Sequence, residues 1–170
     1  MRKVIYLDMD GVLADFDKQY FRNGRKSFEF EEFEKEVMDN ALFLRLEKMP
    51  DFEELITGVF EVANEYGFDV EICSSVHALA QTMIDYASEQ KRQWLIHNNL
   101  KSLKTNFVER KSGKARFADE NTILIDDSIE CITYFTEAGG NAICHKNAAS
   151  TVVILKKLAK KISPQLRVAS

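Results

Sequence analysis

Two pairs of aspartates in this sequence have the residue type and spacing of groups that share a cation. Asp8 and Asp10 are separated by one residue and followed by Gly11, whereas Asp126 and Asp127 are adjacent. Two carboxylates this close repel each other unless a cation lies between them or one is protonated. The glycine permits a tight turn and lets the backbone approach a ligand closely. Both pairs are therefore candidates for a cation site.

Each pair follows a short apolar run, Val4–Leu7 in the first case and Thr122–Ile125 in the second. Such runs, ended by a turn signal, are typical of strands buried on both faces of a sheet. A doubly wound α/β fold places its chemistry just beyond the carboxyl ends of these strands. If the chain stays extended, Asp8 and Asp10 point the same way. One acidic strand end is commonly an ordinary turn, but two favour a functional site.

Further segments predict the rest of an α/β fold. We expect strands at 69–73, 104–108 and 141–147, and helices at 51–66, 77–100 and 149–162. Pro50 and Asp51 favour a helix start, and Gly67 favours its end. Segment 17–49 is rich in Phe, Glu and Lys and predicts one or two short helices inserted after the first strand.

Both acidic pairs match motifs of a known superfamily. The stretch D-M-D-G-V-L-A-D-F at 8–16 resembles motif I of the haloacid dehalogenase (HAD) superfamily of aspartyl phosphotransferases, in the spelling of its 5'(3')-deoxyribonucleotidase branch. The stretch I-L-I-D-D at 123–127 resembles motif IV. Thinner resemblances lie at 43–50, at 90–95 (Q-K-R-Q-W-L, where the family has Glu first) and at 141–147.

The resemblance implies a fold for the whole chain. Residues 1–170 would form a single HAD-like domain with a Rossmann-like α/β architecture. Its central parallel sheet would have five strands in the order 5-4-1-2-3, flanked by helices. Segment 17–49 would form a small helical cap over the active site, inserted after strand 1.

The resemblance also implies roles for the four aspartates. Asp8 would be the nucleophile that forms an aspartyl-phosphate, and Asp10 the general acid and then the general base. Mg²⁺ would be held by the Asp8 side chain, the Asp10 backbone carbonyl and Asp126. Asp127 would complete the metal site by orienting these ligands. The cation would cancel the repulsion between a carboxylate and an anionic phosphate.

Phosphate ligands follow from two further motifs of the family. Ser74 matches the motif II hydroxyl at the end of the second strand, with Ser75 beside it. The motif III lysine is expected shortly before the fourth strand, where Lys114 fits best and Lys111 is the alternative. A solvated basic turn is the structural explanation for these lysines.

Aromatic residues offer a candidate wall for a base or sugar. Phe16, Phe43 and Trp94 are the residues that we consider for this role, with Phe16 as the substrate-contacting candidate. Such aromatics are more often simply part of a core, and this interpretation stays open beside the first.

The expected function is that of a magnesium-dependent phosphomonoesterase acting on (deoxy)nucleoside monophosphates. One alternative is another small phosphomonoester, such as a sugar phosphate or a nucleic-acid 3'-phosphate. A second alternative is a HAD-fold binding domain without turnover. Retention of both acidic pairs, a motif II serine and a lysine disfavours the binding domain.

Composition limits the partners. The chain is 45% hydrophobic and 29% charged, as in soluble globular proteins, with a net charge of −4 that disfavours long nucleic acid. No uncharged run reaches the roughly 18 residues of a membrane span, and no signal peptide is expected. The three cysteines, Cys73, Cys131 and Cys144, predict reduced thiols in the cytoplasm. A homodimer is compatible with the sequence, which does not determine the oligomeric state.

Overall fold

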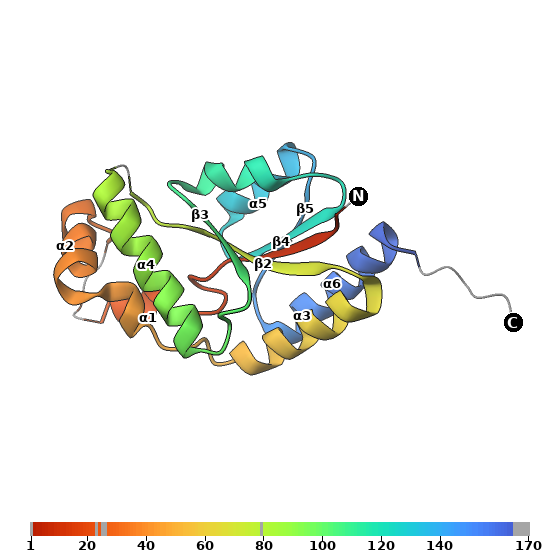
Figure 1. Ribbon diagram of the computed structural model, residues 1–170, viewed down its shortest axis with the longest axis horizontal. Coiled ribbons are helices and arrows are strands. Elements are labelled where there is room, and N and C mark those ends of the chain that lie inside the picture. The colour runs from red at the N-terminus through yellow and green to blue at the C-terminus, as the bar shows by residue number, and fades with distance from the viewer. Residues whose placement is uncertain (1, 23, 25–26, 79, 165–170) are drawn as a thin grey trace, which may run out of the picture.

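A five-stranded, all-parallel sheet lies at the centre of the fold (Figure 1). The computed structural model describes residues 2–22, 24, 27–78 and 80–164. The strands are β1 Val4–Leu7, β2 Asp69–Ser75, β3 Lys104–Val108, β4 Thr122–Asp126 and β5 Asn141–Cys144. Their order is β3-β2-β1-β4-β5, and each neighbouring pair runs parallel. This is the predicted order read from the other edge, so the predicted sheet is confirmed.

Helices cover both faces of this sheet. They are α1 Phe16–Tyr20, α2 Phe30–Asn40, α3 Phe52–Tyr66, α4 Gln81–His97, α5 Ile129–Glu137 and α6 Ala148–Ile162, with the 3-10 helices η1 Leu42–Arg45 and η2 Lys111–Phe117. In Figure 1, α3 and α6 pack together on one side of the sheet, and α5 lies on the other side against η2. The predicted flanking helices are therefore present.

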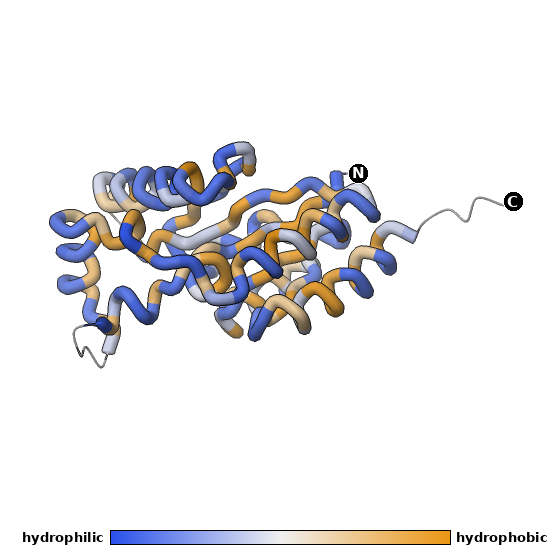
Figure 2. Tube along the Cα trace, turned by 90° about the horizontal axis from the view of Figure 1, so that it is seen from below, coloured by the Kyte–Doolittle hydropathy of each residue, from blue (hydrophilic) through white to orange (hydrophobic). Residues whose placement is uncertain are grey.

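Alternation along β1 explains why both faces are covered. Ile5 and Leu7 belong to the large buried cluster that includes Leu55 of α3. Val4 and Tyr6 belong to a second buried cluster, with residues of α5. Successive side chains of a strand point to opposite faces, so an apolar strand needs a helical layer on each side. Figure 2 shows the apolar residues concentrated in the middle of the molecule.

The register of the sheet brings the acidic strand ends together. Leu7 at the end of β1 pairs with Ile72 of β2 and with Ile125 of β4. Because all three strands run parallel, the residues that follow them emerge at the same edge. The backbone N–H of Asp8 donates to the carbonyl of Ile125 at 3.0 Å, which places Asp8 beside Asp126.

The segment between β1 and α3 forms its own group of helices. α1, α2 and η1 contact one another, and α2 and η1 also pack against α4. Figure 1 shows these elements together at one end of the molecule, beyond the carboxyl ends of the central strands. The described part of the chain contains no helix with the length and apolarity that a membrane crossing requires.

Several predicted boundaries shift, for local reasons. The helix predicted from 77 begins at Gln81, because the N–H groups of Val76 and Ala78 donate to carbonyls at the end of β3. The strand predicted over 141–147 ends at Cys144, because Asn147 caps α6 through its side chain. The basic loop after β3 contains η2, and α5 was not predicted.

Candidate active site

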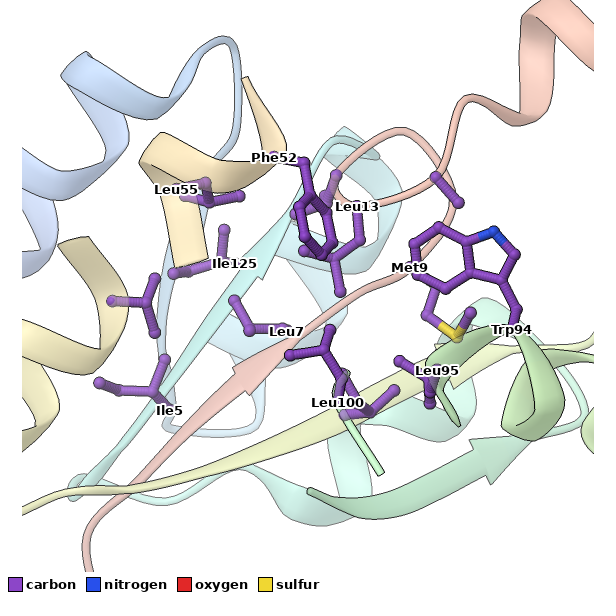
Figure 3. Close-up of a cluster of buried hydrophobic side chains, with 14 of the residues drawn as sticks. Ile5, Leu7, Met9, Leu13, Phe52, Leu55, Trp94, Leu95, Leu100 and Ile125 are labelled. Carbon is purple, nitrogen blue, oxygen red and sulfur yellow. The ribbon is translucent and has the colours of Figure 1, made fainter. Parts of the chain in front are cut away.

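The loop after β1 directs two carboxylates into one cavity. Asp8 and Asp10 both line a cavity of about 370 Å³, as their spacing predicts. Met9 between them is buried in the apolar core, where Figure 3 shows it among Trp94 and Leu95. The carbonyl of Met9 accepts the N–H groups of residues 12, 13 and 14, so the loop closes tightly directly after the aspartates.

Gly11 determines how closely the two acidic loops approach. Its φ is +74°, a left-handed conformation that favours glycine. A Cβ at this position would lie 2.2 Å from Oδ2 of Asp127. Any side chain would therefore collide with the carboxylate of the second pair. The glycine allows the β1 loop and the β4 loop to share one site.

Three carboxylates converge at this point. Oxygens of Asp8, Asp126 and Asp127 all lie within 4.8 Å of one another. Asp126 is fully buried, and its Oδ1 accepts the backbone N–H of Ser128 at 2.9 Å. Asp8 is also buried, whereas Asp127 is exposed. Two buried carboxylates at such distances are unfavourable without compensating positive charge. Three clustered oxygen donors match the ligand preference of a hard divalent cation.

Two buried carboxylate oxygens lack an aligned donor. Oδ1 of Asp8 and Oδ1 of Asp10 accept no hydrogen bond from the residues that the structure describes. The ammonium nitrogen of Lys114 lies 3.0 Å from Asp8 Oδ1, so this oxygen has an ion pair without hydrogen-bond geometry. Buried acceptors are normally satisfied, and exceptions favour a ligand or ion that completes the site.

Lys114 lies within the acidic cluster, and Lys111 does not. The Nζ of Lys114 is 2.5 Å from Asp126 Oδ2, and the side chain is fully buried. Burial lowers the pKa of Lys114, but the negative charges of Asp8 and Asp126 outweigh it and raise the pKa above the usual value. Lys111 lies at the cavity wall and pairs with Glu130 at 3.3 Å.

A second buried lysine, which the sequence analysis did not predict as a site residue, contacts the carboxylate of Asp10. Lys91 of α4 donates from Nζ to Asp10 Oδ2 at 2.7 Å and to Ser74 Oγ at 2.9 Å. It also lies 4.4 Å from the ring centre of Phe43. Helical spacing would have identified it, because Lys91 shares the buried face of α4 with Ala87, at i−4.

The lysines separate the pKa values of the two β1 carboxyls. Burial raises the pKa of Asp8, but the charges of Lys114 and Lys91 outweigh it, so the pKa lies below its ordinary value. Burial also raises the pKa of Asp10, Lys91 opposes this, and the charge of Asp8 adds to it, so the pKa lies above its ordinary value. Burial and Asp8 raise the pKa of Asp127 to about 7. Carboxyl groups whose pKa values differ in this way are suited to different catalytic roles.

The segment after β2 adds two hydroxyls and a histidine. Ser74 is buried against Lys91, whereas Ser75 lines the cavity, with its Oγ 3.2 Å from His77 Nε2. His77 has a φ of +52°, which is uncommon for a residue with a Cβ. Burial and the charge of Lys91 lower the pKa of His77 to about 4. This neutral histidine was not predicted.

Only one of the three aromatic candidates lines the cavity. Phe16 does so, together with Phe21 and Phe28. Phe43 is fully buried, and Trp94 is buried with its Nε1 donating to the carbonyl of Leu46 at 2.8 Å. The proposed wall of Phe16, Phe43 and Trp94 is therefore wrong for the last two, which belong to the core.

The comparisons with known proteins identify the fold. No family model and no curated protein sequence matches the chain. The chain is similar in structure to a HAD-superfamily hydrolase from Ehrlichia chaffeensis, with a TM-score of 0.52, 13% identity, and coverage of 93% of this chain and 98% of that one. A HAD family hydrolase from Deinococcus radiodurans with bound phosphate and sodium has a TM-score of 0.50, 13% identity, and coverage of 91% and 88%. The fold of this chain is therefore the HAD fold.

Proposed function

We propose that this protein is a magnesium-dependent phosphomonoesterase that dephosphorylates (deoxy)nucleoside monophosphates. The observation that carries the proposal is the pairing of two carboxylates that line one cavity, buried Asp8 and partly buried Asp10, with two buried lysines. Lys91 approaches Asp10 at 2.7 Å, and Lys114 approaches Asp8 at 3.0 Å. Each carboxylate keeps an oxygen without an aligned donor. A purely structural ion-pair network would normally satisfy these oxygens.

Asp8 has the properties of a nucleophile in this site. Its pKa lies below the ordinary value, so the carboxylate is ionised at neutral pH. In the first step, an oxygen of Asp8 forms a bond to phosphorus while the bond from phosphorus to the sugar oxygen breaks. This gives an aspartyl-phosphate and divides one difficult displacement into two easier ones.

Asp10 has the properties of a proton donor. Its pKa lies above the ordinary value, and it shares the cavity with Asp8. In the first step Asp10 gives its proton to the departing sugar oxygen. In the second step it takes a proton from the water that attacks phosphorus. The bond to Asp8 then breaks, and inorganic phosphate leaves.

The acidic cluster fits a divalent cation. Asp8, Asp126 and Asp127 would hold it by their side chains, because their oxygens converge within 4.8 Å, and Asp10 would add its backbone carbonyl. When bound, Mg²⁺ neutralises charge on the phosphate and lets a carboxylate approach it. Four carboxyls and only two lysine ammonium groups form this cluster, so a divalent cation would offset the excess negative charge.

The remaining polar groups are suited to hold phosphate oxygens. Lys91 and Lys114 are fully buried cations, and the hydroxyl of Ser74 lies 2.9 Å from Lys91. Ser75 adds a second hydroxyl on the cavity wall. Positively charged groups fixed in a low-dielectric site stabilise the charge of a transferring phosphoryl group. The solved HAD family hydrolase from Deinococcus radiodurans contains bound phosphate and sodium, an anion and a cation of the kinds proposed here.

The aromatic part of the cavity favours a nucleoside as the leaving group. Phe16, Phe21 and Phe28 line it, and all three belong to or border the segment 17–49. Rings of this kind offer flat apolar surface for a base. We propose that segment 17–49, with α1, α2 and η1, is the cap that closes the site and selects the substrate.

One assay series tests the proposal. Phosphate release from p-nitrophenyl phosphate is measured with excess Mg²⁺ for the wild type and for Asp8→Asn. Nucleoside 5'- and 3'-monophosphates and sugar phosphates are then compared by kcat/KM. We expect turnover by the wild type only and the highest kcat/KM for nucleotides. A higher kcat/KM for sugar phosphates than for nucleotides would show that sugar phosphates are the substrate class. A folded wild type that binds nucleotides without any turnover would identify a binding domain.

A further inference from the structure

A second cavity lies next to the active-site cavity. It has a volume of about 520 Å³, against about 370 Å³ for the first, and the two share Phe28, His77 and Lys111 as lining residues. A molecule bound at Asp8 and Asp10 that passed these three shared residues would reach the second space. Ligand sites in proteins commonly have volumes of 300–1,000 Å³, so both cavities together are within the usual range.

The second cavity has exposed aromatic walls. Phe28, Phe30 and Tyr134 line it, and each keeps more than a third of its surface exposed, at 45%, 47% and 37% respectively. Phe28 also lines the first cavity. Large aromatic side chains around a cavity provide stacking surfaces for a planar ring. A nucleobase is such a ring.

Among the residues that the structure describes, Arg110 is the cation of this cavity that has no ion-pair partner. Glu130 lies 3.3 Å from Lys111, and Glu109 lies 3.9 Å from Arg116. Within the part of the chain that the structure describes, no carboxylate lies at ion-pair distance from Arg110. Arg110 lines the cavity and is exposed. A guanidinium matches the geometry of a phosphate, which it can bind through two parallel hydrogen bonds.

We propose that the base of the substrate lies against Phe28, which lines both cavities, and that the second cavity binds a second phosphate, so that the preferred substrate is a nucleoside 3',5'-bisphosphate. This rests on the proposed function, since it extends the same site. One phosphate lies at Asp8, where its ester bond is cleaved: water supplies the new P–O bond, and the sugar oxygen leaves as a hydroxyl. The other phosphate binds Arg110 and is retained in the product, a nucleoside monophosphate.

The test compares kcat/KM for deoxyadenosine 5'-monophosphate and deoxyadenosine 3',5'-bisphosphate at fixed Mg²⁺. We expect the wild type to favour the bisphosphate by about 10-fold or more, the scale of one charge-assisted contact. In Arg110→Ala this ratio falls by about 10-fold, and Arg110→Lys recovers part of it. Lys157→Ala is the matched control, because exposed Lys157 of α6 lines neither cavity and carries the same charge. Its ratio stays at the wild-type value.

Binding separates this inference from the function on which it rests. Dissociation constants for both nucleotides are measured with the wild type and with Asp8→Asn, each with and without Arg110→Ala. Arg110-dependent binding of the bisphosphate without phosphate release would overturn the proposed function alone. Phosphate release from monophosphates, together with a bisphosphate-to-monophosphate ratio of kcat/KM that does not change in Arg110→Ala, would overturn the second-phosphate site alone. Faster release from a 5'-phosphorylated oligonucleotide than from the bisphosphate would also overturn it.

Discussion

The ammonium nitrogen of Lys91 lies 2.7 Å from Oδ2 of Asp10, although the two residues are 81 positions apart in the sequence. Lys114, from a different segment, makes the corresponding contact with Asp8 at 3.0 Å. Each carboxylate of the β1 loop therefore has its own buried cation. This arrangement keeps both acids near the β1 end while allowing their pKa values to move in opposite directions.

Replacing Lys91 tests its contribution. Lys91→Met keeps the length of the side chain and removes the charge that faces Asp10 and Ser74. We expect kcat/KM for a nucleoside monophosphate to fall about 100-fold, the scale of losing one fixed electrostatic contact to the reacting group. Lys101→Met, at an exposed position after α4, is the control. Equal activities of the two variants would contradict a role for Lys91.

Replacement of the two lysines of η2 should affect activity to very different degrees. Lys114 is buried between Asp8 and Asp126, whereas Lys111 pairs with Glu130 at the cavity wall. We expect Lys114→Ala to lower kcat by about 100- to 1,000-fold. Lys111→Ala should lower it by less than about 10-fold. Steady-state kinetics with p-nitrophenyl phosphate measure both effects. A larger loss in Lys111→Ala than in Lys114→Ala would show that Lys111 is the lysine of the active site.

Asp8→Asn should abolish turnover and leave the fold intact. The amide cannot attack phosphorus, so we expect a loss of at least about 1,000-fold in kcat. The change also removes a negative charge from the cluster around Asp126 and Asp127, which offsets the lost pairing with Lys114. The melting temperature should stay within a few degrees of the wild type. Wild-type turnover by this variant would exclude the aspartyl-phosphate.

Magnesium should stabilise the protein as well as activate it. A ligand that binds only the folded state raises the free energy of unfolding, by about 2.7 kcal/mol at 100 times its Kd. We expect MgCl₂ to raise the melting temperature by about 5 °C or more and EDTA to abolish turnover. Asp126→Asn should lose the thermal shift, whereas exposed Asp39→Asn should keep it. Full activity in EDTA would count against a metal site.

His77 should make stability depend on pH between about 4 and 6.5. Its pKa is about 4 in the folded protein against an ordinary value of 6.5, so the unfolded chain binds the proton more tightly. Stability from this group is present above pH 6.5 and is lost as the pH falls toward 4, by about 3 kcal/mol at most. His77→Asn, which tolerates the left-handed conformation, should flatten this dependence in urea unfolding series. An unchanged pH profile would show that the imidazole is not buried as described.

The sequence predicts the sheet and its acidic edge well, because apolar strands and strand-end residues leave local signals. Asp8, Asp10 and Asp126 could be selected in this way, whereas Lys114 was selected only through the resemblance to motif III. The structure places Lys114 against Asp8 and Asp126, and Asp10 lines the same cavity as Asp8. Lys91 could not be found by that rule, because it reaches the site from the side of a helix and not from a strand end. A search for charged residues on the apolar face of α4 would have found it.

Other features depend on contacts that the sequence does not display. His77 has its unusual φ because the chain leaves β2 along the end of β3 before α4 begins. Helix α5 has nine residues, and the exposed Ile129 and Tyr134 interrupt a simple apolar stripe. Phe43 and Trp94 resembled a substrate wall, but a pattern of aromatics alone does not distinguish a cavity from a core.

Gly11 has no side chain, and this allows the loop after β1 to lie against the carboxylate of Asp127. A methyl group at position 11 would already overlap the carboxylate of Asp127, so even alanine should turn this carboxylate away from Asp8 and Asp126 and would also strain a backbone with a φ of +74°. A library randomised at this codon and selected for phosphate release should therefore return glycine almost exclusively. Position 11 would then be as restricted as the aspartates themselves, although it contributes no chemical group to the reaction.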